Sequence, residues 1–158
     1  MRNRIQVLII LILIPLGGLY LYLDGETVTM REFFFAETPV VHFGDLPVRV
    51  EIVDSEIERA QGLSGREKID DRYKGMFFIF PEEDYIGIWM KDMKFSIDIV
   101  WIDEDLTVIG IEKNVSPNTY PRVFRPNRPA KYVLETETQY PELIGIHVGQ
   151  KVRIPLEY

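Results

Sequence analysis

The order of hydrophobic and polar positions divides the chain into a long apolar start and a remainder of short, strand-like runs. Residues 5–23 form an unbroken run of 19 uncharged residues, most of them Ile and Leu. A helix rises about 1.5 Å per residue, so this run would span roughly 28 Å, close to the hydrocarbon thickness of a bilayer. The pattern therefore predicts a single transmembrane helix at the amino terminus.

The charges on either side of this run predict its orientation. Arg2 and Arg4 precede it, and Asp24 and Glu26 follow it. Basic residues favour the cytoplasmic side, so we expect a membrane-anchored protein whose carboxyl-terminal domain is extracytoplasmic. A cleaved signal peptide shares the charged start and the apolar centre, and secretion after cleavage is the alternative. The sequence shows no small-x-small cleavage site before Asp24, which favours the uncleaved anchor.

Two local signals open the remainder of the chain. We assign residues 24–38 to a connector and residues 39–158 to one globular domain. Val40–Phe43 and Val48–Val53 flank Gly44 and Asp45, which predicts a hairpin of two strands.

A helix signal follows the hairpin. Ser55 and Glu58 match a capping box, and Ile57, Ala60 and Leu63 give an apolar stripe at helical spacing. The sequence predicts one short helix there, ending near Gly62 or Gly65.

Beyond residue 75 the apolar runs are short and strand-like. Six of them are predicted strands: Met76–Phe80, Ile86–Met90, Phe95–Ile102, Thr107–Glu112, Lys131–Thr136 and Lys151–Ile154. With the hairpin this makes eight strands, and their spacing leaves no room for a helix after most of them. The predicted fold class is mainly β, a small β-barrel or sandwich-like domain with one or two short helices, after the transmembrane helix.

Composition narrows the chemistry that is available. The 158 residues include 18 Lys and Arg against 25 Asp and Glu, a net charge of −7, and no Cys. An acidic chain is a poor match for a phosphate backbone, so we expect no nucleic-acid partner. Without cysteine there is no disulfide, no thiolate nucleophile and no zinc site of the Cys type. Methionine is usually core packing, so we expect no metal and no cofactor.

Several segments, taken in order, are similar to a known family. They are Glu58–Arg66, Gly75–Phe80, Trp89–Asp92, Ile97–Asp103, Pro129–Glu135 and Gly145–Val152. Together they resemble the uncharacterised family called domain of unknown function 192. The resemblance implies a shared fold and a domain that often follows a signal or anchor segment, but it implies no activity.

The first candidate site lies in Trp89-Met90-Lys91-Asp92. Trp89 and Lys91 share one face of a strand, so an aromatic ring and an ammonium group together could form the floor of a ligand site. Asp98 lies on a strand between apolar neighbours and needs a partner, for which Arg66, Lys91 and Arg59 are available. We predict that Arg66 and Asp98 form a buried polar scaffold behind this ligand-binding floor.

A second candidate surface is basic. Arg122, Arg125 and Arg128 recur at every third residue within a proline-rich segment. Polyproline II has three residues per turn, so this spacing would align three guanidinium groups along one edge. Such an edge suits an anionic envelope polymer or a protein partner, whereas pairing with the chain's own carboxylates is the alternative.

Catalytic patterns are few. The sequence has no nucleophile elbow, Walker loop or dinucleotide fingerprint. Asp92, Asp98 and Glu135 could provide a carboxylate pair, as an envelope hydrolase or isomerase would require. Since no nucleophile and base set is recognisable, we favour a non-catalytic binding module for an envelope component or a protein partner, and the enzyme remains the alternative.

Overall fold

The computed structural model describes residues 10–14, 18–23, 26–29, 38–138 and 145–154, and the chain divides into two compact units, residues 1–37 and 38–158. The described part of the first unit is a three-stranded antiparallel sheet. Its strands are β1 (Ile10–Ile14), β2 (Gly18–Leu23) and β3 (Glu26–Thr29).

The predicted transmembrane helix falls in this first unit. Residues 5–9 and 15–17 of the predicted helix lie outside the described residues, and so does most of the predicted connector, including Phe33–Phe35. Where residues 10–14 and 18–23 are described they are strands, so the structure does not show the helix there. No helix among the described residues is long and apolar enough to cross a membrane.

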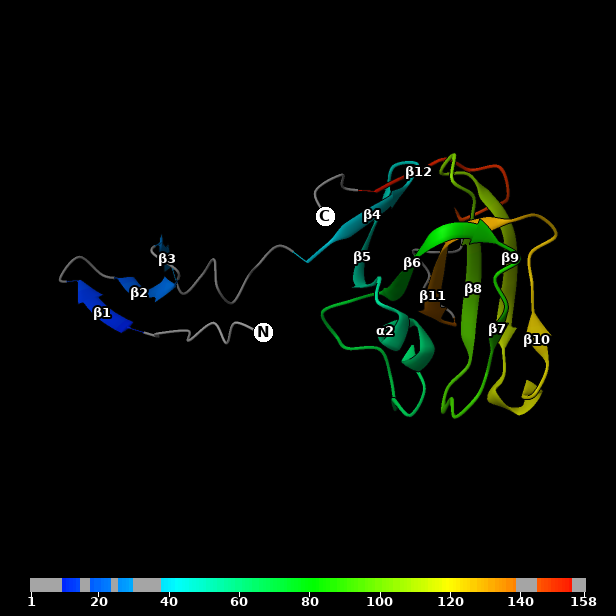
Figure 1. The fold of residues 1–158 in the computed structure, drawn as a ribbon, viewed down its shortest axis with the longest axis horizontal. Coiled ribbons are helices and arrows are strands. Elements are labelled where there is room, and N and C mark those ends of the chain that lie inside the picture. The colour runs from blue at the N-terminus through cyan, green and yellow to red at the C-terminus, as the bar shows by residue number, and fades with distance from the viewer. Residues whose placement is uncertain (1–9, 15–17, 24–25, 30–37, 139–144, 155–158) are drawn as a thin grey trace, which may run out of the picture. The chain divides into compact units, whose positions relative to one another are not determined.

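The second unit is mainly β, as the sequence predicts (Figure 1). Seven strands form one sheet in the order β12-β4-β5-β6-β11-β8-β9, and β7 and β10 form a separate antiparallel pair. The strands of the large sheet, in chain order, are β4 (Val40–Phe43), β5 (Leu46–Val53), β6 (Gly75–Asp84), β8 (Ile97–Ile102), β9 (Val108–Val115), β11 (Ala130–Glu137) and β12 (Val152–Arg153). The small pair is β7 (Ile88–Trp89) and β10 (Val123–Phe124).

The hairpin of β4 and β5 is confirmed. The two strands pair antiparallel, with Phe43 opposite Leu46 across the tight turn. Gly44 has a φ of 60°, a left-handed conformation that glycine adopts at little cost. The turn chemistry alone was therefore enough to locate this hairpin.

A parallel pair that the sequence analysis did not predict follows the hairpin. β5 and β6 run parallel, with Val50 opposite Gly75, and the crossover between them carries helix α2 (Glu56–Gln61). Every other pairing in the large sheet is antiparallel. The crossover matters for the site, because it places α2 over the sheet instead of at its edge.

The large sheet is curled into a half-barrel whose two edge strands meet at one end. Thr107, just before β9, forms an antiparallel bridge with Lys151, just before β12. The Val108 amide donates to the Gln150 carbonyl at 2.9 Å, and the Val152 amide donates to the Leu106 carbonyl at 2.8 Å. Backbone bonds thus close part of the edge that an open sheet would leave unpaired.

The two faces of the curled sheet bury separate apolar clusters. One cluster, the inner core, takes residues from all seven strands, from Val41 on β4 to Val108 on β9 and Val152 on β12. The other, the outer core, packs Met76, Ile99 and further residues of the opposite face beneath the β7–β10 pair and the segment that follows α2. Each strand can serve both cores because successive side chains alternate between faces.

Helix α2 is capped as predicted but packs differently. The Ser55 hydroxyl accepts from the Glu58 amide, and the Glu58 carboxylate accepts from the Ser55 amide, which completes the capping box; the helix ends at Gly62. The predicted apolar stripe is wrong, because Ile57 is 84% exposed and Ala60 is also exposed. Leu63, beyond the helix, is the stripe residue that enters the outer core.

Candidate functional site

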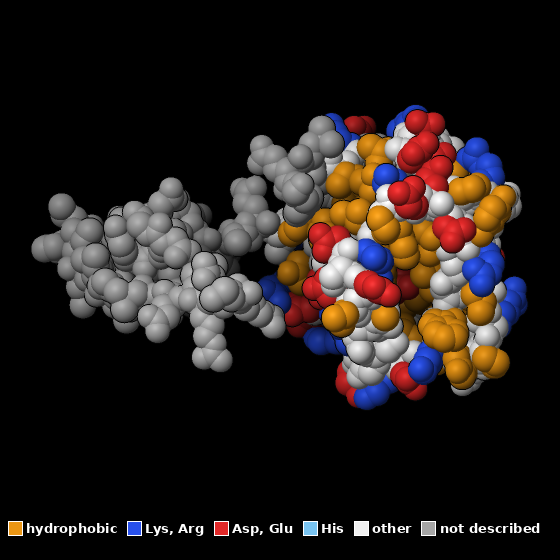
Figure 2. Space-filling view, viewed as in Figure 1, with side chains coloured by type: hydrophobic (Ala, Val, Ile, Leu, Met, Phe, Trp, Pro, Cys, Tyr) orange, Lys and Arg blue, Asp and Glu red, His pale blue; other side chains and the backbone are white. Residues whose placement is uncertain are grey.

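A cavity of about 420 Å³ opens between helix α2, the end of β6 with the loop to β7, and the outer face of the sheet. Small-molecule sites in proteins usually measure about 300 to 1,000 Å³, so this volume suits a ligand of modest size. Figure 2 shows this face of the second unit, where hydrophobic side chains gather in a hollow with charged side chains around it.

The walls of the cavity are largely apolar. Phe78 and Phe80 come from β6, Leu63 from the segment after α2, and Ile88 from β7. These side chains face the cavity because they belong to the outer-core face of their elements or pack against it. An apolar wall favours a ligand with an apolar or aromatic body.

Glu135 lies among these apolar walls and is the most unusual residue of the site. Its neighbours across the sheet are Met76 on β6 and Ile99 on β8, both fully enclosed in the outer core. The residue is only 6% exposed, and its carboxyl group makes no hydrogen bond or ion pair with any residue that the structure describes. Burial raises the pKa of Glu135 to about 8. At neutral pH its side chain is therefore mostly protonated, a buried polar group that faces a cavity.

Two exposed aromatic residues belong to the rim of the cavity. Trp89 is 49% exposed and Tyr85 is 52% exposed, although both contribute to the lining. The Trp89 ring packs edge-on against Tyr120 with 5.9 Å between ring centres, and the Lys91 ammonium lies 5.8 Å from the Trp89 ring centre. Trp89 and Lys91 share a face, as strand alternation predicts, although Lys91 is not among the cavity-lining residues.

The two arginines that line the cavity are held by other partners. Arg59 donates from Nη1 to the carbonyl groups of Asp54 and Ile79, and its guanidinium group lies 5.3 Å from the centre of the Phe80 ring. Arg125 donates from Nη1 to the Tyr85 carbonyl at 2.9 Å. Neither guanidinium group is paired with Glu135.

Asp98 lies on the other face of the sheet. Asp98 is opposite Thr136 across β8 and β11, whereas Glu135 is opposite Ile99, so the two carboxyl groups point to opposite faces. Asp98 Oδ1 accepts a hydrogen bond from the Asn114 amide at 2.7 Å. The expected pairing of Asp98 with Arg59, Arg66 or Lys91 is wrong, because the described contact of its carboxylate is with this backbone amide and Arg66 is paired with Glu51.

Asp92 shapes a turn and does not line the cavity. Its φ is 56°, a left-handed conformation that Asp tolerates better than most residues. Its carbonyl accepts from the Gly65 amide at 2.8 Å, which ties the turn to the segment after α2. The structure therefore does not bring Asp92, Asp98 and Glu135 together around one cavity.

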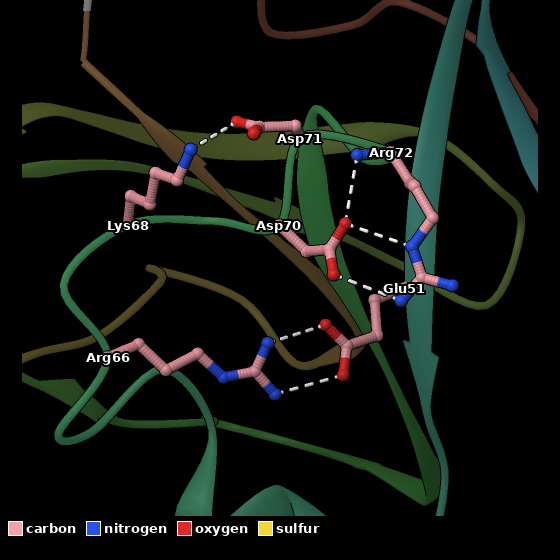
Figure 3. Close-up of polar contacts among 6 residues, drawn as sticks. All are labelled: Glu51, Arg66, Lys68, Asp70, Asp71 and Arg72. Carbon is pink, nitrogen blue, oxygen red and sulfur yellow. Dashed lines mark hydrogen bonds and ion pairs between the residues drawn. The ribbon is translucent and has the colours of Figure 1, made fainter.

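Arg66 forms a different ion pair from the expected one. Its two terminal nitrogens bind both oxygens of Glu51 at 2.7 and 2.9 Å, a bidentate pair shown in Figure 3. This hydrogen bonding raises the pKa of Arg66. The predicted scaffold of Arg66 with Asp98 is wrong, because Arg66 is paired with Glu51 on β5.

The three loop arginines have separate partners instead of forming one edge. Arg122 lies 4.5 Å from the centre of the Phe124 ring, Arg125 binds the Tyr85 carbonyl, and Arg128 lies 3.6 Å from an Asp103 carboxylate oxygen. Strand β10 interrupts the segment between Arg122 and Arg125, so the regular polyproline spacing is lost.

From the sequence, Glu135 is one of three candidate carboxylates, and the apolar walls around it are not predicted. One signal was present: in the β11 segment Glu135 shares a face with Val133, a core residue by type. The contribution of Phe78, Phe80 and Tyr85 could not be found in this way, because it depends on where the α2 crossover lies.

Comparison with known proteins gives one family and several relatives. The family DUF192, described as "Uncharacterized ACR", matches residues 40–154. A UPF0127 protein of Pyrococcus abyssi is 30% identical over 106 residues, which are 66% of this chain and 84% of the relative.

Two crystal structures share the fold. A protein of unknown function from Novosphingobium aromaticivorans has a TM-score of 0.64 at 28% identity, covering 73% of this chain and 83% of its own. A protein named as a candidate transcription regulator from Sinorhizobium meliloti has a TM-score of 0.63 at 25% identity, covering 73% of this chain and 92% of its own.

Proposed function

The chain belongs to the uncharacterised DUF192 family, and from this premise we propose that its second unit is a non-catalytic domain that binds a small molecule outside the cytoplasm. The observation that carries the proposal is the apolar cavity with the unpaired carboxyl group of Glu135 inside it. A concave apolar site with a few convergent polar groups and one strongly perturbed pKa is the usual signature of a binding or active site.

The separation of the three carboxylates that the sequence offers favours binding over catalysis. A carboxylate pair for hydrolysis needs two carboxyl groups on one cavity, about 5 to 9.5 Å apart. Asp98 is on the opposite face of the sheet, and Asp92 does not line the cavity. Glu56 on α2 and Asp84 at the end of β6 also line the cavity, but both are exposed, so neither shares the enclosed apolar setting of Glu135. The Asp84 carboxylate also accepts a hydrogen bond from the Tyr85 amide.

The proposed location rests on the apolar run of residues 5–23 and the charges beside it. Such a run favours a membrane anchor with its basic end in the cytoplasm. A domain held in this way would meet small components of the cell envelope, which we propose as the source of the ligand.

Blocking the cavity tests the proposed function. Ala60 lines the cavity from α2, whereas Ile57 is on the same helix, 84% exposed, and does not line the cavity. Ala60→Trp should therefore fill the mouth, while Ile57→Trp places the same side chain in solvent. A library of small molecules is screened against the full chain by ligand-observed NMR, and the binding molecules are titrated against both variants.

We expect ligands whose binding is lost with Ala60→Trp and kept with Ile57→Trp. If no molecule binds, or if the ligands that bind tolerate Ala60→Trp, the cavity is not the binding site and the proposal is overturned. Circular dichroism of both variants checks that the fold is retained.

A further inference from the structure

The carboxyl group inside the cavity has no counter-ion among the residues that the structure describes, and we infer that the ligand is a small organic cation, a protonated amine on an apolar or aromatic body. The inference rests on the proposed function and names the chemical class of its ligand. It follows from the charges around Glu135, from the aromatic walls, and from the way in which the nearby arginines are already bound.

The row of residues across the sheet provides no cation for Glu135. Met76 and Ile99 are its immediate neighbours, and beyond them the row continues to Glu51 on β5 and Glu112 on β9. Glu51 is bound on both oxygens by Arg66. The charged side chains nearest to Glu135 in this row are therefore acids. Arg66, the cation described there, is paired with Glu51 and not with Glu135.

The mouth of the cavity provides no cation for Glu135 either. Arg59 is held by two backbone carbonyl groups and by the Phe80 ring, and Arg125 is held by the Tyr85 carbonyl. An unpaired buried carboxylate is costly, and Glu135 therefore retains its proton; a cation beside it would favour the ionised form. The cation that would complete the site is missing from the described part of the chain, so a ligand can provide it.

The aromatic walls add a second preference for a cation. Phe78, Phe80 and Trp89 all line the cavity. Two of these rings already attract cations of the chain: Arg59 lies over Phe80 at 5.3 Å, and Lys91 lies 5.8 Å from Trp89. The negative face of an aromatic ring attracts an ammonium group, and the ring itself suits an apolar body.

An anionic ligand fits this arrangement poorly. At the mouth the acids Glu56 and Asp84 balance the charges of Arg59 and Arg125, so the mouth provides no net attraction for an anion. Inside, an anion would oppose the ionisation of Glu135. A neutral ligand would gain only an ordinary hydrogen bond from Glu135. An ammonium ion would take the ionised form of the carboxyl group as its partner, and charge-assisted hydrogen bonds are about twice as strong as neutral ones.

Three matched compounds test the inference. They are 2-phenylethylamine, 2-phenylethanol and phenylacetate, which share a phenyl ring and differ in charge. Each is titrated calorimetrically into the full chain at pH 7, in mild detergent with protein-free detergent as the blank. We expect the amine to bind about tenfold or more tightly than the alcohol, and the acid to bind most weakly. Nα-acetyl-lysine methylamide, a fourth probe, presents the ammonium group as a peptide would.

Glu135→Gln with Glu82→Gln as control assigns any preference to the cavity. Glu82 is an exposed residue on β6, so its substitution removes the same charge at the surface. We expect the ratio of amine to alcohol affinity to fall to about one with Glu135→Gln and to stay unchanged with Glu82→Gln.

The outcomes separate the inference from the proposed function. The inference is supported if either amine binds more tightly than 2-phenylethanol and loses that advantage with Glu135→Gln; the tighter amine then indicates a free or a peptide-borne ammonium group. It is overturned if the alcohol or the acid binds as tightly as the amines while Ala60→Trp still abolishes binding, a result that leaves the proposed function intact. If no small molecule binds in the NMR screen, or if the ligands that bind tolerate Ala60→Trp, the proposed function itself is overturned.

Discussion

At the residue scale, the buried carboxyl group of Glu135 makes the stability of the fold depend on pH. A carboxyl group in an apolar setting resists ionisation, and here burial raises the pKa of Glu135 to about 8. The unfolded chain ionises this group near the ordinary value of 4.5. Between these two pH values the folded chain holds a proton that the unfolded chain has released.

This difference predicts a pH dependence of stability. As the pH rises from about 5 to about 8, the free energy of unfolding should fall by about 1.4 kcal/mol per pH unit, because the unfolded chain binds fewer protons. Glu135→Gln removes the titrating group, so its stability should be nearly constant over the same range. Urea unfolding at pH 5, 6, 7 and 8 measures both slopes, and parallel curves for the two proteins would refute the assignment.

Other shifted carboxylates do not confuse this measurement. Hydrogen bonds from Ser55 lower the pKa of Glu58, and hydrogen bonds from Arg72 lower the pKa of Asp70 to about 2. A lowered carboxylate pKa contributes stability that is lost only as the pH falls below the ordinary value near 4. Their effect therefore has the opposite sign and lies below the range in which Glu135 acts.

Gly75 makes a second prediction at the scale of one residue. A Cβ atom at this position would lie 2.7 Å from the Glu135 carbonyl oxygen and 2.8 Å from a Leu134 methyl group, both closer than carbon contacts allow. Gly75→Ala should lower the free energy of unfolding by about 2 to 4 kcal/mol, because the strand that carries Glu135 must shift.

The matched control for this change is Gly145→Ala, where no atom of the described residues lies within 4 Å of the added carbon. Urea unfolding of both variants should show a large loss for Gly75→Ala and a change within about 0.5 kcal/mol for Gly145→Ala. Equal losses in the two variants would show that the neighbouring strand accommodates the added carbon at Gly75 without a loss of stability.

Single elements were predicted where local chemistry determines them. Gly44 and Asp45 mark a turn, and Ser55 with Glu58 marks a helix start; both signals lie within a few residues of what they control. β10 was missed because it has only two residues, and its pairing with β7 joins Val123 to the distant Trp89. The parallel pairing of β5 and β6 is not predicted, because neither segment contains a local sequence signal for which strand it pairs with or in which direction.

The candidate site was only partly predictable for the same reason. Ile97, Ile99 and Trp101 lie on one face of β8, as the alternation of a strand requires, and this much follows from the sequence. Whether Glu135 would share a cavity with Asp98 depends on the register of β11 against β8, since a shift of one residue reverses the face of every side chain. Which residues line the cavity therefore depends on strand pairings that the sequence does not determine locally.

The cap of helix α2 gives a prediction at the scale of an element. Ser55→Ala removes the acceptor for the Glu58 amide and should lower the free energy of unfolding by about 1 kcal/mol. Ser55→Asn retains a side-chain acceptor at the same position and should keep most of the stability. Thermal unfolding of the two variants distinguishes capping from a general effect of substitution. Equal losses of stability in both variants would exclude capping as the cause. Because α2 forms one wall of the cavity, a frayed helix should also weaken ligand binding.

At the scale of the second unit, one sheet supports two cores. The inner core fills the half-barrel, and the outer core lies between the sheet and the elements that cover it. The sequence is compatible with both a barrel and a sandwich. The curled sheet explains why, because its strands are buried on both faces over much of their length. The cavity belongs to the outer core, where α2 covers the sheet less completely than strands fill the half-barrel.

The apolar run of residues 5–23 carries the last prediction, which concerns the whole chain. If it anchors the protein, the full chain expressed in bacteria should sediment with membranes and resist extraction by alkaline carbonate. Placing Lys at both Ile12 and Leu13 should release the protein, because each Lys at the centre of a membrane helix costs about 2.5 to 3.5 kcal/mol. Lys at both Ile57 and Val148, which are 84% and 60% exposed, adds the same charge to the second unit and should leave the protein in the membrane fraction.

Protease added to spheroplasts should digest the second unit if it lies outside the cytoplasm. Recovery of the unaltered chain in the soluble fraction would remove both the anchor and the envelope as the source of the ligand, while the preference of the cavity for a cation would still stand on the geometry around Glu135.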